Sequence, residues 1–87
     1  MAEDKRKEAL SKGEVIVQVK RNGIFQKLPF KLVRRKTNDG EVPYLFLDRF
    51  LDVSELVRVA EEYQLPVESP VGKIYPKGKK EMDFLGL

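Results

Sequence analysis

The side chains in this sequence that could do chemistry are cations and aromatic rings, and they alternate along residues 20–50. Lysine and arginine together make 17 of the 87 residues, whereas histidine and cysteine are absent. Histidine is the commonest general base and metal ligand, and cysteine supplies thiolates, so their absence removes the usual routes to catalysis and to zinc binding. The chemistry that remains is recognition, in which rings stack on a flat partner and cations hold an anionic one.

The carboxylates near the middle of the chain have structural explanations. Asp39 precedes Gly40 in a predicted turn, and Asp52 with Glu55 has the spacing of a helix capping box. No carboxylate pair flanks a predicted cleft, no acidic cluster has the spacing of a metal site, and the glycines form no phosphate-binding loop. We therefore expect a protein that is not an enzyme and has no cofactor, no metal and no small-molecule substrate.

Two short turns fold the region of rings and cations into a β-meander. Valines alternate with other residues over 14–21, and Asn22-Gly23 is the strongest signal for a two-residue hairpin turn. A second strand is predicted over 24–36, and a third over 43–50, with Asp39-Gly40 as the turn between them.

Each turn, taken by itself, sets a register for the two strands that it joins. The first pairs Arg21 with Ile24, and the second pairs Asn38 with Glu41. Pro29 cannot donate to a ladder, so we expect a bulge or a change of partner there. Both registers put one set of apolar residues on the same face, which supports the meander. This predicted core face carries Val15, Val17, Leu28, Phe30, Leu32, Leu45, Leu47 and Leu51.

An amphipathic helix is predicted over 52–66, because apolar residues recur there at helical spacing and Pro66 ends the pattern. Its apolar stripe should pack on the core face of the sheet, which makes two layers. The predicted fold class is α+β, with a three-stranded antiparallel β-meander, one helix on its core face and a short C-terminal edge strand over 71–75. The stripe comprises Val53, Leu56, Val59, Ala60 and Tyr63.

Length and composition indicate one small globular domain. Hydrophobic residues make 41% of the chain and charged residues 36%, with a net charge of +3. We expect the domain over 14–76, a flexible or marginally helical arm over 1–13, and a lysine-glycine spacer with an acidic-apolar tail over 77–87. No apolar run is long enough to span a membrane and the start is too charged for a secretory signal, so a cytoplasmic location is expected. The many charged residues beside few Asn and Gln fit a heat-adapted host.

The second face of the predicted sheet mixes rings with cations. The registers place Lys31 opposite Asp48 and Arg35 opposite Tyr44 on this face. Three interpretations are open: association with a protein partner or a second copy, binding of single-stranded RNA or DNA, or coverage of the rings by the chain's own tail or arm. We prefer association, with nucleic acid as the alternative. The candidate binding face comprises Lys20, Phe25, Lys27, Lys31, Arg35, Tyr44, Phe46 and Phe50.

The tail is the second candidate for recognition. An acidic-apolar peptide behind a flexible spacer can add to a partner's sheet edge or fill a groove. The same residues can instead dock on their own domain and secure the terminus, which is the preferred interpretation. The candidate anchors are Met82, Phe84, Leu85 and Leu87.

Overall fold

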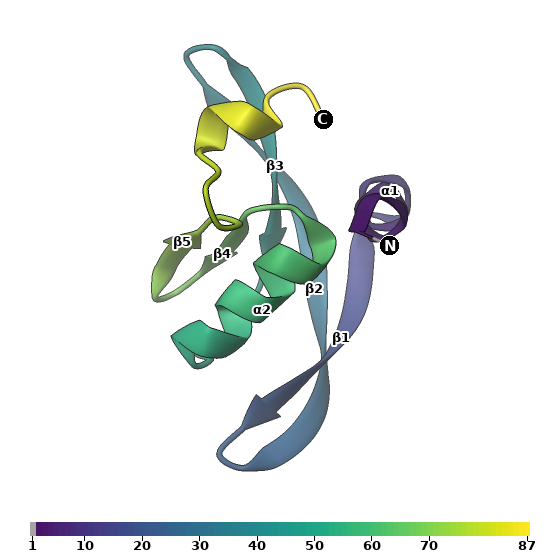
Figure 1. Ribbon diagram of the computed structural model, residues 1–87, viewed down its shortest axis with the longest axis vertical. Helices are drawn as coiled ribbons and strands as arrows, with labels where there is room; N and C mark the ends of the chain where they lie inside the picture. The colour runs from purple at the N-terminus through teal and green to yellow at the C-terminus, as the bar shows by residue number, and fades with distance from the viewer. Residues whose placement is uncertain (1) are drawn as a thin grey trace.

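The computed structural model of the chain describes the backbone of residues 2–87 and the side chains from residue 4 onward (Figure 1). Its elements form one mixed sheet with two α-helices and a short 3-10 helix. In chain order they are α1 (Ala2–Lys12), β1 (Glu14–Arg21), β2 (Ile24–Thr37), β3 (Gly40–Phe46), α2 (Val53–Tyr63), β4 (Val67–Ser69), β5 (Gly72–Ile74) and η1 (Glu81–Phe84).

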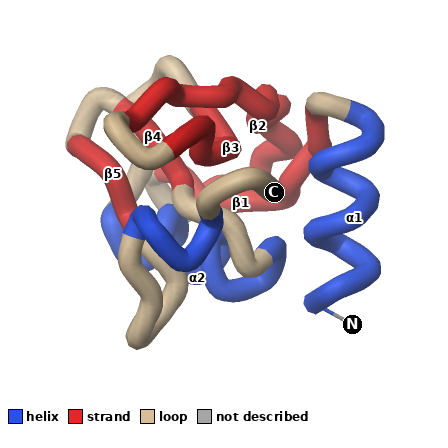
Figure 2. The backbone as a smooth tube through the Cα atoms, turned by 90° about the horizontal axis from the view of Figure 1, so that it is seen from above, coloured by secondary structure: helices blue, strands red, loops and turns tan. Residues whose placement is uncertain are grey.

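The sheet has five strands in the order β1-β2-β3-β4-β5. The first three strands form the predicted antiparallel meander, and α2 covers one side of it, so the α+β two-layer fold is confirmed (Figure 2). β4 was not predicted. It runs parallel to β3, where the amide of Leu45 donates to Pro66 O at 2.8 Å and the amide of Leu47 donates to Glu68 O at 3.0 Å. β5 then pairs antiparallel with β4 at the edge.

The register of β1 with β2 agrees with the prediction, including the pairing of Arg21 with Ile24. Of the two alternatives predicted at Pro29, a bulge is wrong, because Pro29 pairs directly with Ile16, whereas β2 does change partner nearby, from β1 to β3 at Lys31. In a two-residue hairpin the closing pair exchanges both hydrogen bonds, so the even residues of β2 bond to β1. The nitrogen of Pro29 therefore faces the β3 side, where pairing begins only at Lys31, and no ladder hydrogen bond is lost.

The predicted register of β2 with β3 is wrong by two residues. Thr37 rather than Asn38 closes the turn, and it pairs with Gly40. The Thr37 hydroxyl donates to Gly40 O at 2.8 Å and accepts from the amide of Asp39 at 3.2 Å, which stabilises this closure. Because side chains alternate with period two, a shift of two residues changes the partners and keeps the faces. Lys31 lies opposite Phe46, not opposite Asp48, and Arg35 lies opposite Val42, not opposite Tyr44.

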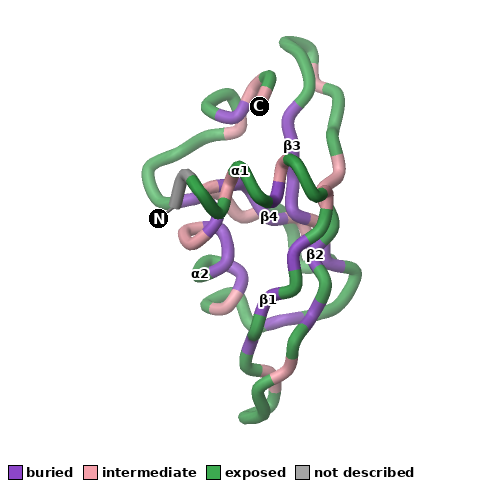
Figure 3. The backbone as a smooth tube through the Cα atoms, turned by 90° about the vertical axis from the view of Figure 1, so that its right-hand side faces the viewer, coloured by how far each residue is buried: buried purple, intermediate pink, exposed green. Residues whose placement is uncertain are grey.

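The core forms between the sheet and α2, with contributions from both ends of the chain. The predicted core residues of the sheet are buried, except that Leu32 is half-buried. Along β1 the exposed and buried residues alternate, as Figure 3 shows. Ala9 of α1 is fully buried, and Gly13 ends that helix with a φ of 75°. Buried residues that the sequence patterns did not predict are Ala9, Val42, Leu65 and Val67.

The predicted capping box of α2 is absent. The side chain of Asp52 makes no cap hydrogen bond, and the helix ends before Pro66 because Gln64 adopts the left-handed conformation. The predicted stripe is buried except for Val53, which is 54% exposed. Glu55, the predicted partner in the box, instead accepts a hydrogen bond from the main-chain amide of Lys20 at 2.6 Å.

Charged side chains of α2 cover part of the free edge of β1. In the hairpin register, the even residues of β1 direct their main-chain groups away from β2. The carboxylate of Glu55 accepts a hydrogen bond from the amide of Lys20, and the guanidinium of Arg58 donates to Gln18 O at 2.7 Å. Arg58 also pairs with Glu55 at 3.2 Å and with Glu62 at 3.3 Å. An edge capped in this way cannot add another strand at these positions.

Glu55→Gln should destabilise the fold at neutral pH by about 1–3 kcal/mol, since it removes a charged acceptor from three hydrogen bonds, one from the Lys20 amide and two from Arg58. The hydrogen bonds from Arg58 and then from the Lys20 amide lower the pKa of the Glu55 carboxyl from its ordinary value of 4.5. A carboxyl with a lowered pKa stabilises the fold above its unfolded pKa, and this contribution is lost as the pH falls through the folded pKa. Urea unfolding of the wild type and of Glu55→Gln at pH 7 and pH 3 measures this contribution to the free energy of unfolding.

The difference between the wild type and Glu55→Gln should shrink from pH 7 to pH 3. The control is Glu41→Gln, which changes an exposed carboxylate of β3 and should stay within about 0.5 kcal/mol of the wild type. An equal loss for Glu55→Gln at both pH values would show that the carboxylate charge has no part in capping β1.

Candidate functional site

One face of the β1–β2 hairpin is open to solvent and carries alternating cations and apolar side chains. Phe25 is 67% exposed and Ile16 is 57% exposed, and Pro29 lies directly opposite Ile16. Lys20 lies opposite Phe25, with its Nζ 5.8 Å from the ring centroid. We call this surface the basic face, and define it by the exposed residues Ile16, Lys20, Phe25, Lys27, Pro29 and Lys31. The same face also carries Gln18 opposite Lys27 and one carboxylate, Glu14, opposite Lys31.

The cations at this sheet surface differ in how far the protein neutralises them. Arg35 donates to the carboxylate of Glu68 from Nε at 3.0 Å and from Nη2 at 2.5 Å, and its Cζ lies 6.0 Å from the ring centroid of Phe46. Lys20, Lys27 and Lys31 form no ion pair with any residue that the structure describes. The charges of these three lysines are therefore available to a partner, whereas the charge of Arg35 is paired with Glu68 of β4.

A hollow continues the basic face where β3 ends. Its volume is about 190 Å³, and Phe46 in its lining is half-buried. Pro29 and Lys31 come from β2, and Asp48 and Arg49 from the loop before α2. The lining residues are Pro29, Lys31, Phe46, Leu47, Asp48 and Arg49. The predicted register already placed Asp48 on the same face as Lys31, but as its direct strand partner and not in the loop that follows β3.

Tyr44 is fully buried, so its ring cannot stack on a partner as the sequence led us to expect. Its hydroxyl lies 3.0 Å from the hydroxyl of Tyr75 and donates to the carboxylate of Glu81. Lys73 Nζ lies 5.0 Å from the centroid of the Tyr44 ring. The pKa of Tyr44 is raised far above its ordinary value, mainly by burial and secondly by these hydrogen bonds. The C-terminal part of the chain thus covers this ring.

Phe50 is 66% exposed but lies outside the sheet. It lines a separate hollow of about 260 Å³ together with residues of the β1–β2 turn and the β4–β5 turn, among them Asn22 and Val71. The structure thus places Phe50 beside the tip of the hairpin, whereas Phe46 lies at the other end of the basic face, across from Lys31.

The tail lies on its own domain. Phe84 is 2% exposed, and Leu85 and Leu87 pack against the core, whereas Met82 is 66% exposed. The amide of Gly86 donates to Glu41 O of β3 at 3.0 Å, and the guanidinium of Arg34 donates to Leu87 O. Three of the four candidate anchors are therefore engaged inside the chain.

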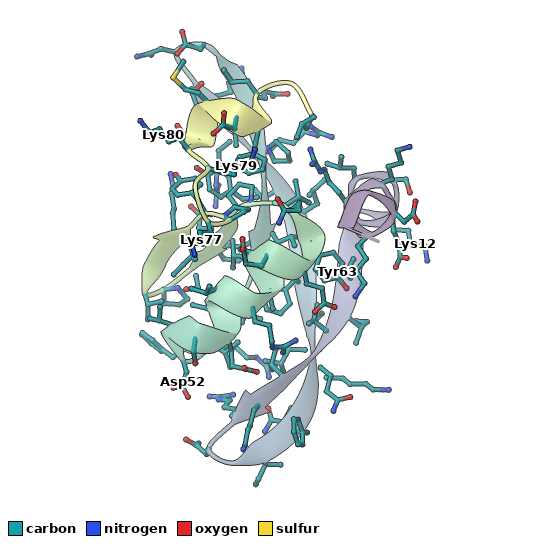
Figure 4. All side chains as sticks on the ribbon, in the orientation of Figure 1. Lys12, Asp52, Tyr63, Lys77, Lys79 and Lys80 are labelled. Atoms are coloured by element: carbon teal, nitrogen blue, oxygen red, sulfur yellow. The ribbon has the colours of Figure 1, made fainter. Side chains whose placement is uncertain are left out.

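The segment that leads to η1 is held to α2 at its start, and its end caps η1. The amide of Lys77 donates to the carboxylate of Glu61 of α2 at 2.7 Å, and the amide of Lys80 donates to Asp83 at 2.7 Å. Figure 4 labels Lys77, Lys79 and Lys80 along this path from α2 towards η1. The predicted spacer thus follows a defined path over the domain.

In the part of the chain that the structure describes, no group of three or more His, Cys, Asp or Glu side chains is arranged to hold a metal ion. None of the described helices is both long enough and apolar enough to cross a membrane.

Comparison of the chain with protein-family models, with curated proteins and with solved structures finds no match.

Proposed function

We propose that this protein is a non-enzymatic binding protein that holds single-stranded nucleic acid on the basic face. The observation that carries the proposal is the set of three lysines without ion pairs, Lys20, Lys27 and Lys31, interleaved with exposed apolar side chains on two paired strands. Lysines neutralise phosphates, and aromatic side chains stack on bases regardless of sequence.

The spacing along β2 suits an extended strand of nucleic acid. Residues on one face of a β-strand recur about every 6.6 Å, so Phe25, Lys27, Pro29 and Lys31 make a row about 20 Å long. Phe25 lies near one end of this row, and Phe46 lies beside Lys31 at the other. Each stacked base contributes about 1–3 kcal/mol, and a duplex keeps its bases inside, so the rings favour single strands.

Self-association through this face has less support than binding of a polyanion. Two copies that met here would bring the lysines of both chains together, and like charges across an interface oppose association. The tail, which offered a second surface for association, is used within the fold, since Phe84 is buried. Association with an acidic protein partner is the competing outcome of the test.

The test is fluorescence anisotropy of the full chain with labelled single-stranded 12-mers of RNA and DNA and with a duplex of the same sequence. We expect the single strands to bind more tightly than the duplex. Affinity should fall with salt at a logarithmic slope of about −2, the value for three phosphate contacts on a single strand (0.7 × 3).

Sedimentation velocity of the same samples separates the competing outcomes. Dimer formation without nucleic acid, together with no binding at 50 mM salt, would overturn the proposal and support self-association. A monomer that binds neither single strands nor duplex would also overturn it, and would direct attention to an acidic protein partner.

A further inference from the structure

We infer that the hollow beside Phe46 accepts a single nucleobase, and that Asp48 gives it a preference for bases with an exocyclic amino group. This inference rests on the proposed function, because it concerns the end of the same surface.

The size and lining of the hollow fit one planar ring system. Its volume is about 190 Å³, and a cavity of about 150 Å³ is enough to hold benzene. The half-buried ring of Phe46 offers an aromatic surface, and Pro29 adds an apolar wall. Arg35, held by Glu68, keeps its guanidinium 6.0 Å from the ring centroid of Phe46, which limits the movement of that ring.

The cations of the hollow are placed to hold the backbone of the strand that carries the base. Lys31 comes from β2 and Arg49 from the loop after β3, so they approach from different elements. Neither side chain forms an ion pair with another residue in the described part of the chain. Both can therefore contact phosphates.

Asp48 is the one acidic residue that lines this hollow. A carboxylate weakens the binding of a polyanion unless it accepts hydrogen bonds, and Asp48 makes no ion pair within residues 4–87. A carboxylate can only accept, and the N4 amino group of cytosine donates, whereas uracil and thymine present the O4 carbonyl at that position. Asp48 should therefore favour cytosine over uracil, which has the same ring size.

The experiment compares binding of rC8 and rU8 to the full chain and to the variant Asp48→Asn. We expect the wild type to bind rC8 about tenfold more tightly than rU8, the discrimination of one good hydrogen-bonded contact to a base. In Asp48→Asn the preference should fall to about twofold or less, because the amide both donates and accepts. Binding of dC8 and dT8 shows whether the preference extends to DNA.

The control is Asp39→Asn, which makes the same charge change in the β2–β3 turn, away from the hollow. It should raise the affinity for both oligomers slightly and keep their ratio. Equal binding of rC8 and rU8 by the wild type, or an unchanged preference in Asp48→Asn, would overturn the inference and leave the proposed function in place. Failure of the wild type to bind any oligomer would instead overturn the proposed function.

Discussion

Replacing Lys20, Lys27 and Lys31 together with glutamine should lower the affinity for single-stranded RNA by about two orders of magnitude at 50 mM salt. Each lysine that contacts a phosphate releases counterions from a single strand and contributes about 0.7 to the salt slope, so the slope should fall by about 2. Glutamine keeps most of the side-chain length and removes only the charge, and the exposed positions should leave stability almost unchanged.

The matched control replaces three other exposed lysines, Lys12, Lys77 and Lys79, with glutamine. These lie on α1 and on the segment before η1, as Figure 4 shows, and their loss lowers the net charge by the same amount. If net charge alone attracts RNA, the two triple variants should lose affinity equally. Equal losses would contradict a specific role for the basic face, and anisotropy at 50, 100 and 200 mM salt distinguishes the two results.

Replacing Phe84 with alanine should destabilise the fold by about 3–5 kcal/mol, the usual cost of truncating a buried aromatic side chain. Phe84 is 2% exposed and belongs to the main core, although it lies only three residues from Leu87. A domain of this size has a total stability of about 5–15 kcal/mol, so the melting temperature should fall by about 15 °C or more. Thermal and urea unfolding followed by circular dichroism measure the loss.

Met82→Ala is the control for Phe84→Ala, because Met82 lies in the same short helix η1 and is 66% exposed. It should change stability by less than about 0.5 kcal/mol. Should Phe84→Ala fail to fold, Phe84→Leu, which keeps most of the volume, should fold with a loss of about 1 kcal/mol. A loss below about 1 kcal/mol for Phe84→Ala would show that the tail lies loosely on the domain and that Phe84 is free to anchor a partner.

The β1–β2 hairpin could be predicted in detail from the sequence. Asn22 and Gly23 both adopt positive φ, 52° and 79°, and few residue pairs other than Asn-Gly do so at low cost. Such a turn leaves one pairing for the strands, and alternating valines select the buried face. The basic face follows from these local features, which explains why Lys20, Phe25, Lys27 and Lys31 lie together as expected.

The sequence does not define the register of the second turn as closely, because Asn38, Asp39 and Gly40 all favour turns and allow more than one closing pair. The structure closes it at Thr37, whose hydroxyl bonds within the turn. The shift of two residues left each side chain on its predicted face of the sheet but changed its cross-strand partner. Asp48 consequently lies beyond the paired part of β3 and lines the hollow near Phe46.

The sequence by itself thus determined the hairpin, the amphipathic helix and the alternation that leaves one sheet face basic, because these depend on neighbours a few residues apart. Only the tertiary structure decided that Glu81 covers Tyr44, that Glu68 holds Arg35, and that Glu55 caps the edge at Lys20. These partners lie 37, 33 and 35 residues apart. Contacts at such distances form through the summed packing of the whole core, which no local pattern of residues specifies.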